Sequence, residues 1–175
     1  MKIAIIGSGN VGGALATQWA QAGHQIYLGL RDLNNFKGTA LLSNPSTSIH
    51  SIKEATKQAE VILVATPPQF AESLAATFGH AEHKIIIDAT NAIRTKPANY
   101  PTAYHALADL TKAELVKCFN STGFENMQQP QYEGMSLDMF MAGDSTKAKK
   151  LPLSSHPRLV LPTAMTLAVA TRSYY

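Results

Sequence analysis

The sequence predicts an α/β protein built on a Rossmann-type, doubly wound and mainly parallel sheet. Short apolar runs alternate with segments of helical periodicity from residue 2 to residue 143, and most of these runs are apolar throughout. Such runs are typical of parallel strands that are covered on both faces. A glycine-rich turn, GSGNVG, separates the first run from the first helical segment. The 175 residues suit one domain with a core of its own.

The first elements are indicated by residue type and by their stop signals. Residues 2–6, KIAII, form a β-rich run closed by Gly7, which predicts a buried strand. From residue 10 to 22 the apolar residues follow helical spacing, and Gly23 ends that helix. Residues 25–30, QIYLGL, predict the second strand.

The later elements repeat this alternation. Residues 34–42 predict a weak helix or a loop. Further strands are expected at 48–52, 60–66, 84–91, 114–119 and 137–143. Further helices are expected at 52–59, 69–78 and 103–110.

Composition narrows the class of protein. Hydrophobic residues make up 45% and charged residues 15%, which is ordinary for a globular protein. No apolar run is long enough to cross a bilayer, and the N-terminal run is too short for a signal peptide. The single cysteine, Cys118, excludes an internal disulfide and fits a reducing compartment. We therefore expect a cytoplasmic protein without a membrane partner.

The net charge of +3 is unevenly distributed along the chain. Residues 145–175 hold five Lys and Arg and no acid, which leaves ten basic against twelve acidic residues in 1–144. No basic stripe with interleaved aromatic residues is present. These observations argue against a nucleic-acid partner.

The turn after the first strand carries the G-x-G-x-x-G spacing at Gly7, Gly9 and Gly12. In this fingerprint the first glycine permits a tight turn, the second lets a pyrophosphate approach the backbone, and the third allows close helix–strand packing. The strand before it and the helix after it supply the context that the motif requires. The alternative is a glycine-rich turn that binds nothing.

The second strand ends in a cation where NAD-binding chains usually have an acid. Arg31 stands there, followed by Asp32. An arginine at this place accommodates the 2′-phosphate of NADP, and Lys37 would add a second positive charge. Asp32 leaves two alternatives open, a carboxylate that takes a ribose hydroxyl or a solvated Arg–Asp pair. We favour NADP(H) over NAD(H).

Several stretches together resemble one known family. MKIAIIGSGNVGGALA, LGLRD, VILVATP, IIIDATN, VKCFNSTGFENM and DMFMAGD occur in this order within residues 1–144. In this the chain is similar to the NADPH:F420 oxidoreductase-like family of Rossmann proteins, which includes the F420-dependent NADP reductases. It is also similar to the NADPH-binding domain of the Steap metalloreductases.

The resemblance implies positions for the cofactor and the acceptor, but it assigns no catalytic residue. The diphosphate would be wrapped by Ser8, Gly9, Asn10 and Val11, and Arg31 would meet the 2′-phosphate. The nicotinamide side would be lined by Ala65, Thr66 and Pro67, with Asn91 and Ala92 near the ribose and ring. The acceptor pocket would be faced by Asn120, Ser121 and Thr122. Leu30 departs from the F420 reductases, which often have a serine before this arginine.

The predicted strands agree with these positions. Thr66, Asn91 and Asn120 fall at carboxyl ends of expected strands, where ligands bind in such sheets. Capping and turn formation are the alternative roles of these residue types.

Hydride transfer asks little of side chains beyond orientation and the exclusion of water. A flavin or F420-like acceptor needs a flat apolar slot, for which Phe119, Phe124, Met127 and the pair Pro67-Pro68 are candidate walls, with ordinary packing as the alternative.

Rival chemistries lack their residues. The chain has no Tyr-x-x-x-Lys and no G-x-S-x-G motif. His80 and His83 have no obvious third partner for a metal. We expect Cys118 to be buried and inert, and His105 to lie on the surface.

Residues 151–175 depart from the resemblance, with three prolines and no acid. We hypothesise a shifted reading frame, because LPTAMTLAVATRSYY can be written in codons that, read two bases later, give ADCYDFGGSDKVVL. The expected division is a dinucleotide-binding domain over 1–144 and an atypical basic tail over 145–175.

The expected function is an NADPH-dependent oxidoreductase whose partner is a small-molecule redox acceptor such as a flavin or F420. A non-catalytic NADP(H)-sensing module, or a degenerate remnant of such a reductase, is the alternative. A homodimer is the default assembly.

Overall fold

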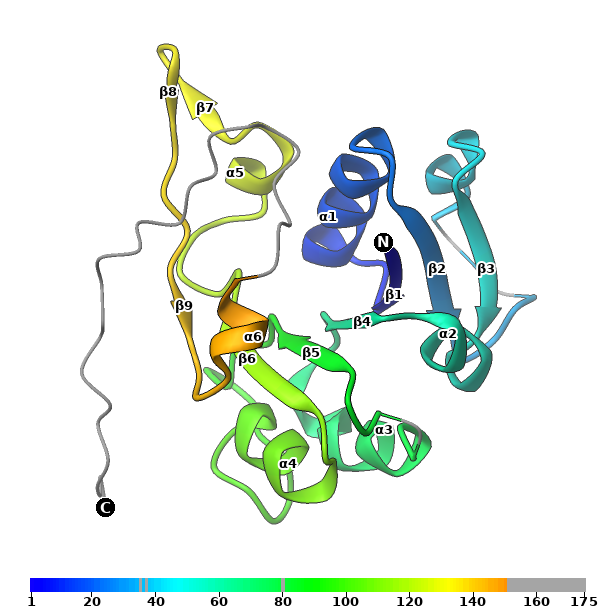
Figure 1. Ribbon diagram of the computed structural model, residues 1–175, viewed down its shortest axis with the longest axis vertical. Helices are drawn as coiled ribbons and strands as arrows, with labels where there is room; N and C mark the ends of the chain where they lie inside the picture. The colour runs from blue at the N-terminus through cyan, green and yellow to red at the C-terminus, as the bar shows by residue number, and fades with distance from the viewer. Residues whose placement is uncertain (35, 37, 80, 151–175) are drawn as a thin grey trace.

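The computed structural model describes residues 1–150 except 35, 37 and 80. Its centre is a seven-stranded sheet in the order β3-β2-β1-β4-β5-β6-β9 (Figure 1). The strands are β1 (Lys2–Ile6), β2 (Gln25–Leu30), β3 (Thr47–Ser51), β4 (Val61–Val64), β5 (Ile85–Asp88), β6 (Glu114–Cys118) and β9 (Met141–Ala142). Neighbouring strands from β3 to β6 pair in parallel, and β9 pairs antiparallel with β6. The predicted Rossmann-type sheet is confirmed.

Helices cover both faces of this sheet. The α-helices are α1 (Asn10–Gln21), α2 (Ile52–Gln58), α3 (Ala71–Thr77), α4 (Ala103–Leu110), α5 (Glu125–Gln128) and α6 (Thr146–Lys149), with 3-10 turns η1 (Thr39–Ser43) and η2 (Pro68–Phe70). Residues of α1, α5 and α6 pack in one core cluster, and residues of α2, α3 and α4 pack in another. Because strand side chains alternate, Ile5 enters the first cluster and Ile6 the second.

Both ends of α2 are satisfied by polar groups. Ser51 and Glu54 form a reciprocal capping box at the start of the helix. At its end, Lys84 Nζ donates to the carbonyl oxygens of Thr56, Lys57 and Ala59 at 2.9, 2.9 and 2.5 Å. A cation is favourable there because the carbonyls at a helix C-terminus carry partial negative charge. These contacts fix the start of β4, which enters the site.

The prediction is least accurate after β6. The expected strand over 137–143 is wrong in length, since only Met141–Ala142 pair with β6. The helix α5 and the hairpin of β7 (Gln131–Tyr132) and β8 (Met135–Ser136) were not predicted, and the hairpin projects from the body in Figure 1. Elements of two to four residues are too short to show a period.

The tail lies mostly outside the described residues. Of the expected tail 145–175, α6 packs on the sheet with Ala148 fully buried in the first core cluster. Residues 151–175, and with them the frame-shift hypothesis, lie outside the described part. The division into 1–144 and 145–175 therefore stays a prediction.

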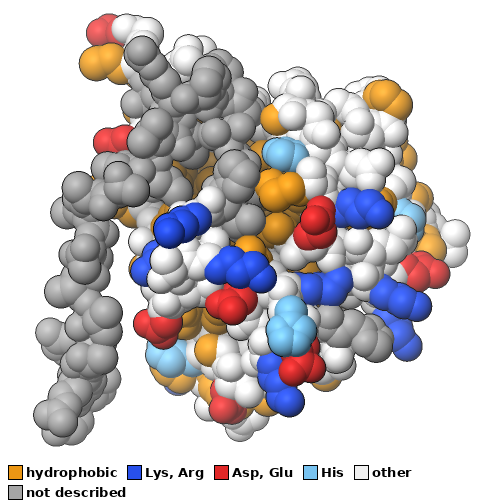
Figure 2. All heavy atoms as spheres, in the orientation of Figure 1, with side chains coloured by type: hydrophobic (Ala, Val, Ile, Leu, Met, Phe, Trp, Pro, Cys, Tyr) orange, Lys and Arg blue, Asp and Glu red, His pale blue; other side chains and the backbone are white. Residues whose placement is uncertain are grey.

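Surface charge on the face shown in Figure 2 is mixed, with acidic and basic side chains interspersed. Among the described residues, no helix has the length and apolar character needed to span a membrane.

Candidate functional site

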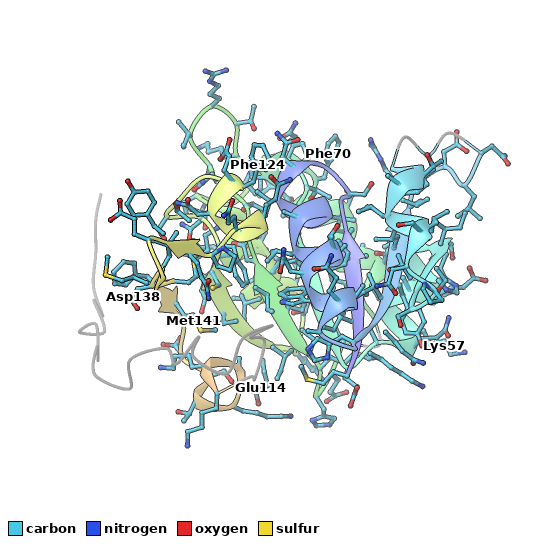
Figure 3. The ribbon with its side chains drawn as sticks, turned by 90° about the horizontal axis from the view of Figure 1, so that it is seen from above. Lys57, Phe70, Glu114, Phe124, Asp138 and Met141 are labelled. Atoms are coloured by element: carbon cyan, nitrogen blue, oxygen red, sulfur yellow. The ribbon has the colours of Figure 1, made fainter. Side chains whose placement is uncertain are left out.

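The candidate site lies at the carboxyl ends of the parallel strands. β1 pairs with β2 on one side and with β4 on the other, so the order in which the strands are added to the sheet reverses at β1. In open α/β sheets ligands bind outside the carboxyl ends at such a switch point. Figure 3 shows Phe70 and Phe124, which follow β4 and β6, on this side of the molecule. Lys57, which precedes β4, and Glu114, the first residue of β6, lie on the opposite side.

The glycine loop is packed closely at two positions and open at the third. Gly7 has φ +100°, and a Cβ there would lie 2.6 Å from the carbonyl oxygen of Ala65. A Cβ on Gly12 would collide with the carbonyl oxygen of Gly7. At Gly9 a Cβ would meet nothing within 4 Å. Gly7 and Gly12 are therefore required for packing, whereas Gly9 borders open space that a ligand can enter.

The start of α1 is suited to an anion. Its N-cap residue is Gly9, no side chain caps it, and its first turn contains no acid. The first N–H groups of a helix lack intrahelical partners and lie at the positive end of its dipole. The open space beside Gly9 and these free donors together fit a diphosphate group.

Thr66 adds an unsatisfied hydroxyl beside this loop. Its Oγ1 is a buried side-chain oxygen that has no hydrogen-bond partner among the described residues. Its Cγ2 would lie 3.0 Å from a Cβ on Gly7, which places the residue against the first glycine. A buried hydroxyl without a partner costs free energy, and a bound ligand can supply the missing hydrogen bond.

Arg31 follows β2 and reaches toward the segment after β4. Its guanidinium carbon lies 4.9 Å from the ring centroid of Phe70. Asp32 accepts a hydrogen bond from the backbone N–H of Asn34 at 2.9 Å, and no Arg31–Asp32 ion pair occurs within the described residues. Both side chains are exposed, so the alternative of a solvated Arg31 and Asp32 in a surface loop stays open, although the two form no direct ion pair. Lys37 lies outside the described residues.

The residues expected at the nicotinamide and acceptor end form a partly connected group. Asn91 Nδ2 donates to the carbonyl oxygen of Asn120 at 3.1 Å, which joins the ends of β5 and β6. Ser121 Oγ lies 3.9 Å from the sulfur of Met139, and Thr122 Oγ1 accepts from Asn126. The exposed residues of this group are Asn91, Ala92, Ser121 and, beside β4, Pro67; Ala65, Thr66, Asn120 and Thr122 are half-buried.

A buried ion pair below this group was not predicted from sequence. Asp88 is fully buried at the end of β5, and its Oδ2 lies 2.8 Å from Lys117 Nζ on β6. Lys117 also donates to the carbonyl oxygen of Thr90, and the Thr90 N–H donates to Asp88 Oδ1 at 2.8 Å. The pair thus holds the turn that precedes Asn91. The signal was present, since DAT ends one strand and a lysine interrupts the next, but pairing them requires the register Asp88 to Lys117.

The proposed walls of an acceptor slot are divided by the structure. Phe119 and Met127 are buried in the first core cluster, and Phe119 makes an edge-on contact with Trp19 at 5.9 Å. Phe119 also has φ +63°, an uncommon conformation for a non-glycine residue, directly before Asn120. Phe124 is only partly buried.

The expected burial of Cys118 and exposure of His105 are confirmed, whereas His80, one of the two candidate metal ligands, lies outside the described residues. Cys118 is buried, and burial raises the pKa of its thiol to about 12. His105 is exposed on α4. Among the described residues no three His, Cys, Asp or Glu side chains gather as a metal cluster; His80 is not among those residues.

The sheet order and the glycine loop define the class as a dinucleotide-binding Rossmann protein. A family model described as NADP oxidoreductase, coenzyme F420-dependent, matches residues 2–92, and the chain belongs to that family. It therefore stands among the NAD(P)-dependent oxidoreductases, as the sequence predicted. No curated protein gives a significant match to the chain.

Solved structures are similar over most of the chain. A putative F420-dependent NADP-reductase from Arthrobacter sp. FB24 is 23% identical with a TM-score of 0.73, covering 85% of this chain and 76% of that one. A hypothetical protein from Sinorhizobium meliloti is 25% identical with a TM-score of 0.69 and the same coverage. Plasmodium falciparum pyrroline carboxylate reductase, solved with NADP bound, is 14% identical with a TM-score of 0.60, covering 86% of this chain and 52% of that one.

Proposed function

We propose that this chain binds NADP(H) across the carboxyl ends of β2, β1 and β4 and exchanges hydride with a flat-ringed acceptor such as a flavin or F420. One observation carries the choice of NADP(H) over NAD(H): Arg31, directly after β2, lies with its guanidinium carbon over the Phe70 ring and is not paired with Asp32, and its N–H donors have no partner among the described residues. Its guanidinium edge is therefore available to a phosphate, which it can bind through two parallel hydrogen bonds.

The remaining contacts follow the strand order. The diphosphate would lie on the loop from Gly7 to Gly12, where free N–H groups of α1 and the open space beside Gly9 support it. The Thr66 hydroxyl would gain its missing hydrogen bond from the bound cofactor. The nicotinamide half would extend past Ala65 and Pro67 to Asn91 and Ala92.

Hydride chemistry would be supplied by the cofactor when it is bound, with two electrons and one hydrogen passing to the acceptor. The chain would orient the ring and exclude water. Asn120, Ser121 and Thr122 would face the acceptor, and Phe124 would be the aromatic wall, because it is only partly buried whereas Phe119 is buried in the core. We further propose that residues 1–144 act as the cofactor domain, that the protein is cytoplasmic and that it forms a homodimer.

The test is a titration with NADPH and with NADH that follows nicotinamide fluorescence. The wild type should bind NADPH at least about tenfold more tightly, or about 1.4 kcal/mol. Arg31→Ala should remove that preference, whereas Arg94→Ala, which removes an exposed arginine from another loop of the same edge, should retain it. Equal affinities in the wild type would refute the role of Arg31.

A non-catalytic NADP(H)-binding module is the second candidate. It is favoured by the small number of packed residues beside β6, where β9 has only two residues and the neighbouring Phe140 is 53% exposed. The two candidates differ in turnover. A reductase should oxidise NADPH, seen as loss of absorbance, when FMN, riboflavin or F420 is added, and a binding module should show no acceptor-dependent rate.

A further inference from the structure

The contact between Arg31 and Phe70 joins two separate segments of the chain. The two residues come from segments that are separated in the sheet by β1, since β2 and β4 pair on either side of it. Ile6, the last residue of β1, is in register with both Gly29 and Val64. The Arg31–Phe70 contact therefore spans the place where the glycine loop begins.

Phe70 is held rigidly on its own side of this contact. It ends the 3-10 turn that begins at Pro68, and its backbone N–H donates to the carbonyl oxygen of Pro67 at 3.2 Å. Its own carbonyl oxygen accepts from Ser73 at 2.9 Å. The ring packs against the second core cluster. Two successive prolines further restrict this backbone, so the ring offers a fixed surface.

Among the described residues, Arg31 has no hydrogen bond that supports it in the way that Phe70 is supported. It is exposed, and the neighbouring carboxylate of Asp32 is engaged by Asn34. A free arginine side chain loses substantial rotamer entropy when it is fixed on a ligand. The guanidinium carbon lies over the Phe70 ring, and the N–H donors of Arg31 have no hydrogen-bond partner among the described residues. The contact with Phe70 therefore leaves donors that can bind a phosphate.

We propose that Phe70 is a positioning residue for cofactor specificity, which orients the Arg31 guanidinium so that its free edge meets the 2′-phosphate. This inference rests on the proposed NADP(H) function. Phe70 acts only through Arg31 in this account. Its effect must therefore appear in NADPH binding and be absent from NADH binding, which offers the arginine no phosphate at that position.

The experiment measures the ratio of NADH to NADPH dissociation constants in Phe70→Leu, Phe70→Tyr and Phe78→Leu. The leucine variant removes the aromatic face but retains an apolar side chain, and should lower the ratio by about two- to fivefold, as expected for an exposed cation–π contact. The tyrosine variant retains the face and should keep the ratio. Phe78→Leu is the matched control, because Phe78 is buried in the same core cluster and makes no contact with Arg31 among those described.

The same substitutions made in the Arg31→Ala protein complete the test. Phe70→Leu should leave the ratio of that protein unchanged, because the partner of Phe70 is already absent. A ratio that is unchanged by Phe70→Leu in the wild type, or lowered by it in the Arg31→Ala protein, would overturn the inference. If Arg31→Ala alone fails to alter the ratio, the proposed function fails instead, so the two failures are distinct.

Discussion

Replacing Lys117 by Met tests whether the buried ion pair beneath the site supports the fold. The substitution retains most of the apolar stem but removes the ammonium that contacts Asp88 Oδ2 at 2.8 Å. Asp88 is fully buried and would lose its charged partner, while the Thr90 carbonyl would lose a donor. Breaking a buried pair from one side costs about 3–5 kcal/mol.

The expected loss lies at the lower end of that range. The Lys117 side chain is 21% exposed, so water can reach the vacated position and solvate the carboxylate in part. A loss of about 3 kcal/mol corresponds to a fall in Tm of about 6–12 °C for a chain of this size. The turn before Asn91 would also loosen, so NADPH binding should weaken under the proposed function.

Thermal unfolding followed by circular dichroism measures this loss. Lys112→Met is the matched control, because Lys112 is exposed just before the same strand. The double variant Asp88→Asn, Lys117→Met should be more stable than Lys117→Met alone, because it leaves no buried charge. A fall in Tm of less than about 3 °C, or a double variant no more stable than the single one, would refute the reasoning.

Three further predictions concern single residues. Gly9→Ala should leave Tm within about 2 °C, since its methyl group meets nothing within 4 Å, but it should weaken NADPH binding about tenfold. Gly12→Ala should lower both Tm and the affinity for NADPH in the same assays, because its methyl group collides with the Gly7 carbonyl oxygen. Burial lowers the pKa of His24 from 6.5, so the unfolded chain binds the proton first, and the free energy of unfolding in urea should decrease as the pH falls below 6.5. His24→Gln should flatten that slope. With a thiol pKa of about 12, Cys118 should react with a disulfide reagent at pH 8 only after unfolding.

Local patterns were sufficient for the sheet and the glycine loop. The run KIAII, the spacing of Gly7, Gly9 and Gly12, and the continuous apolar strands each report a short-range requirement that a sequence displays directly. Cys118 was predicted to be buried for the same reason, because it lies in a mainly apolar strand. Beyond β6 the described elements have two to four residues, which is too short for a hydrophobic period to be recognised in the sequence.

What the sequence alone determined is the fold class, the cofactor loop, and the placement of Arg31, Thr66 and Asn91 at strand ends. Only the tertiary structure decided which of these meet. It places the Arg31 guanidinium over the Phe70 ring, leaves the Thr66 hydroxyl without a hydrogen-bond partner within the described part of the chain, and joins Asp88 to Lys117. The two partners in each contact are separated by about thirty positions or more along the chain, and whether Thr66 has a partner depends on which groups fold around it. The register of the parallel strands brings these residues together at the carboxyl ends of the sheet.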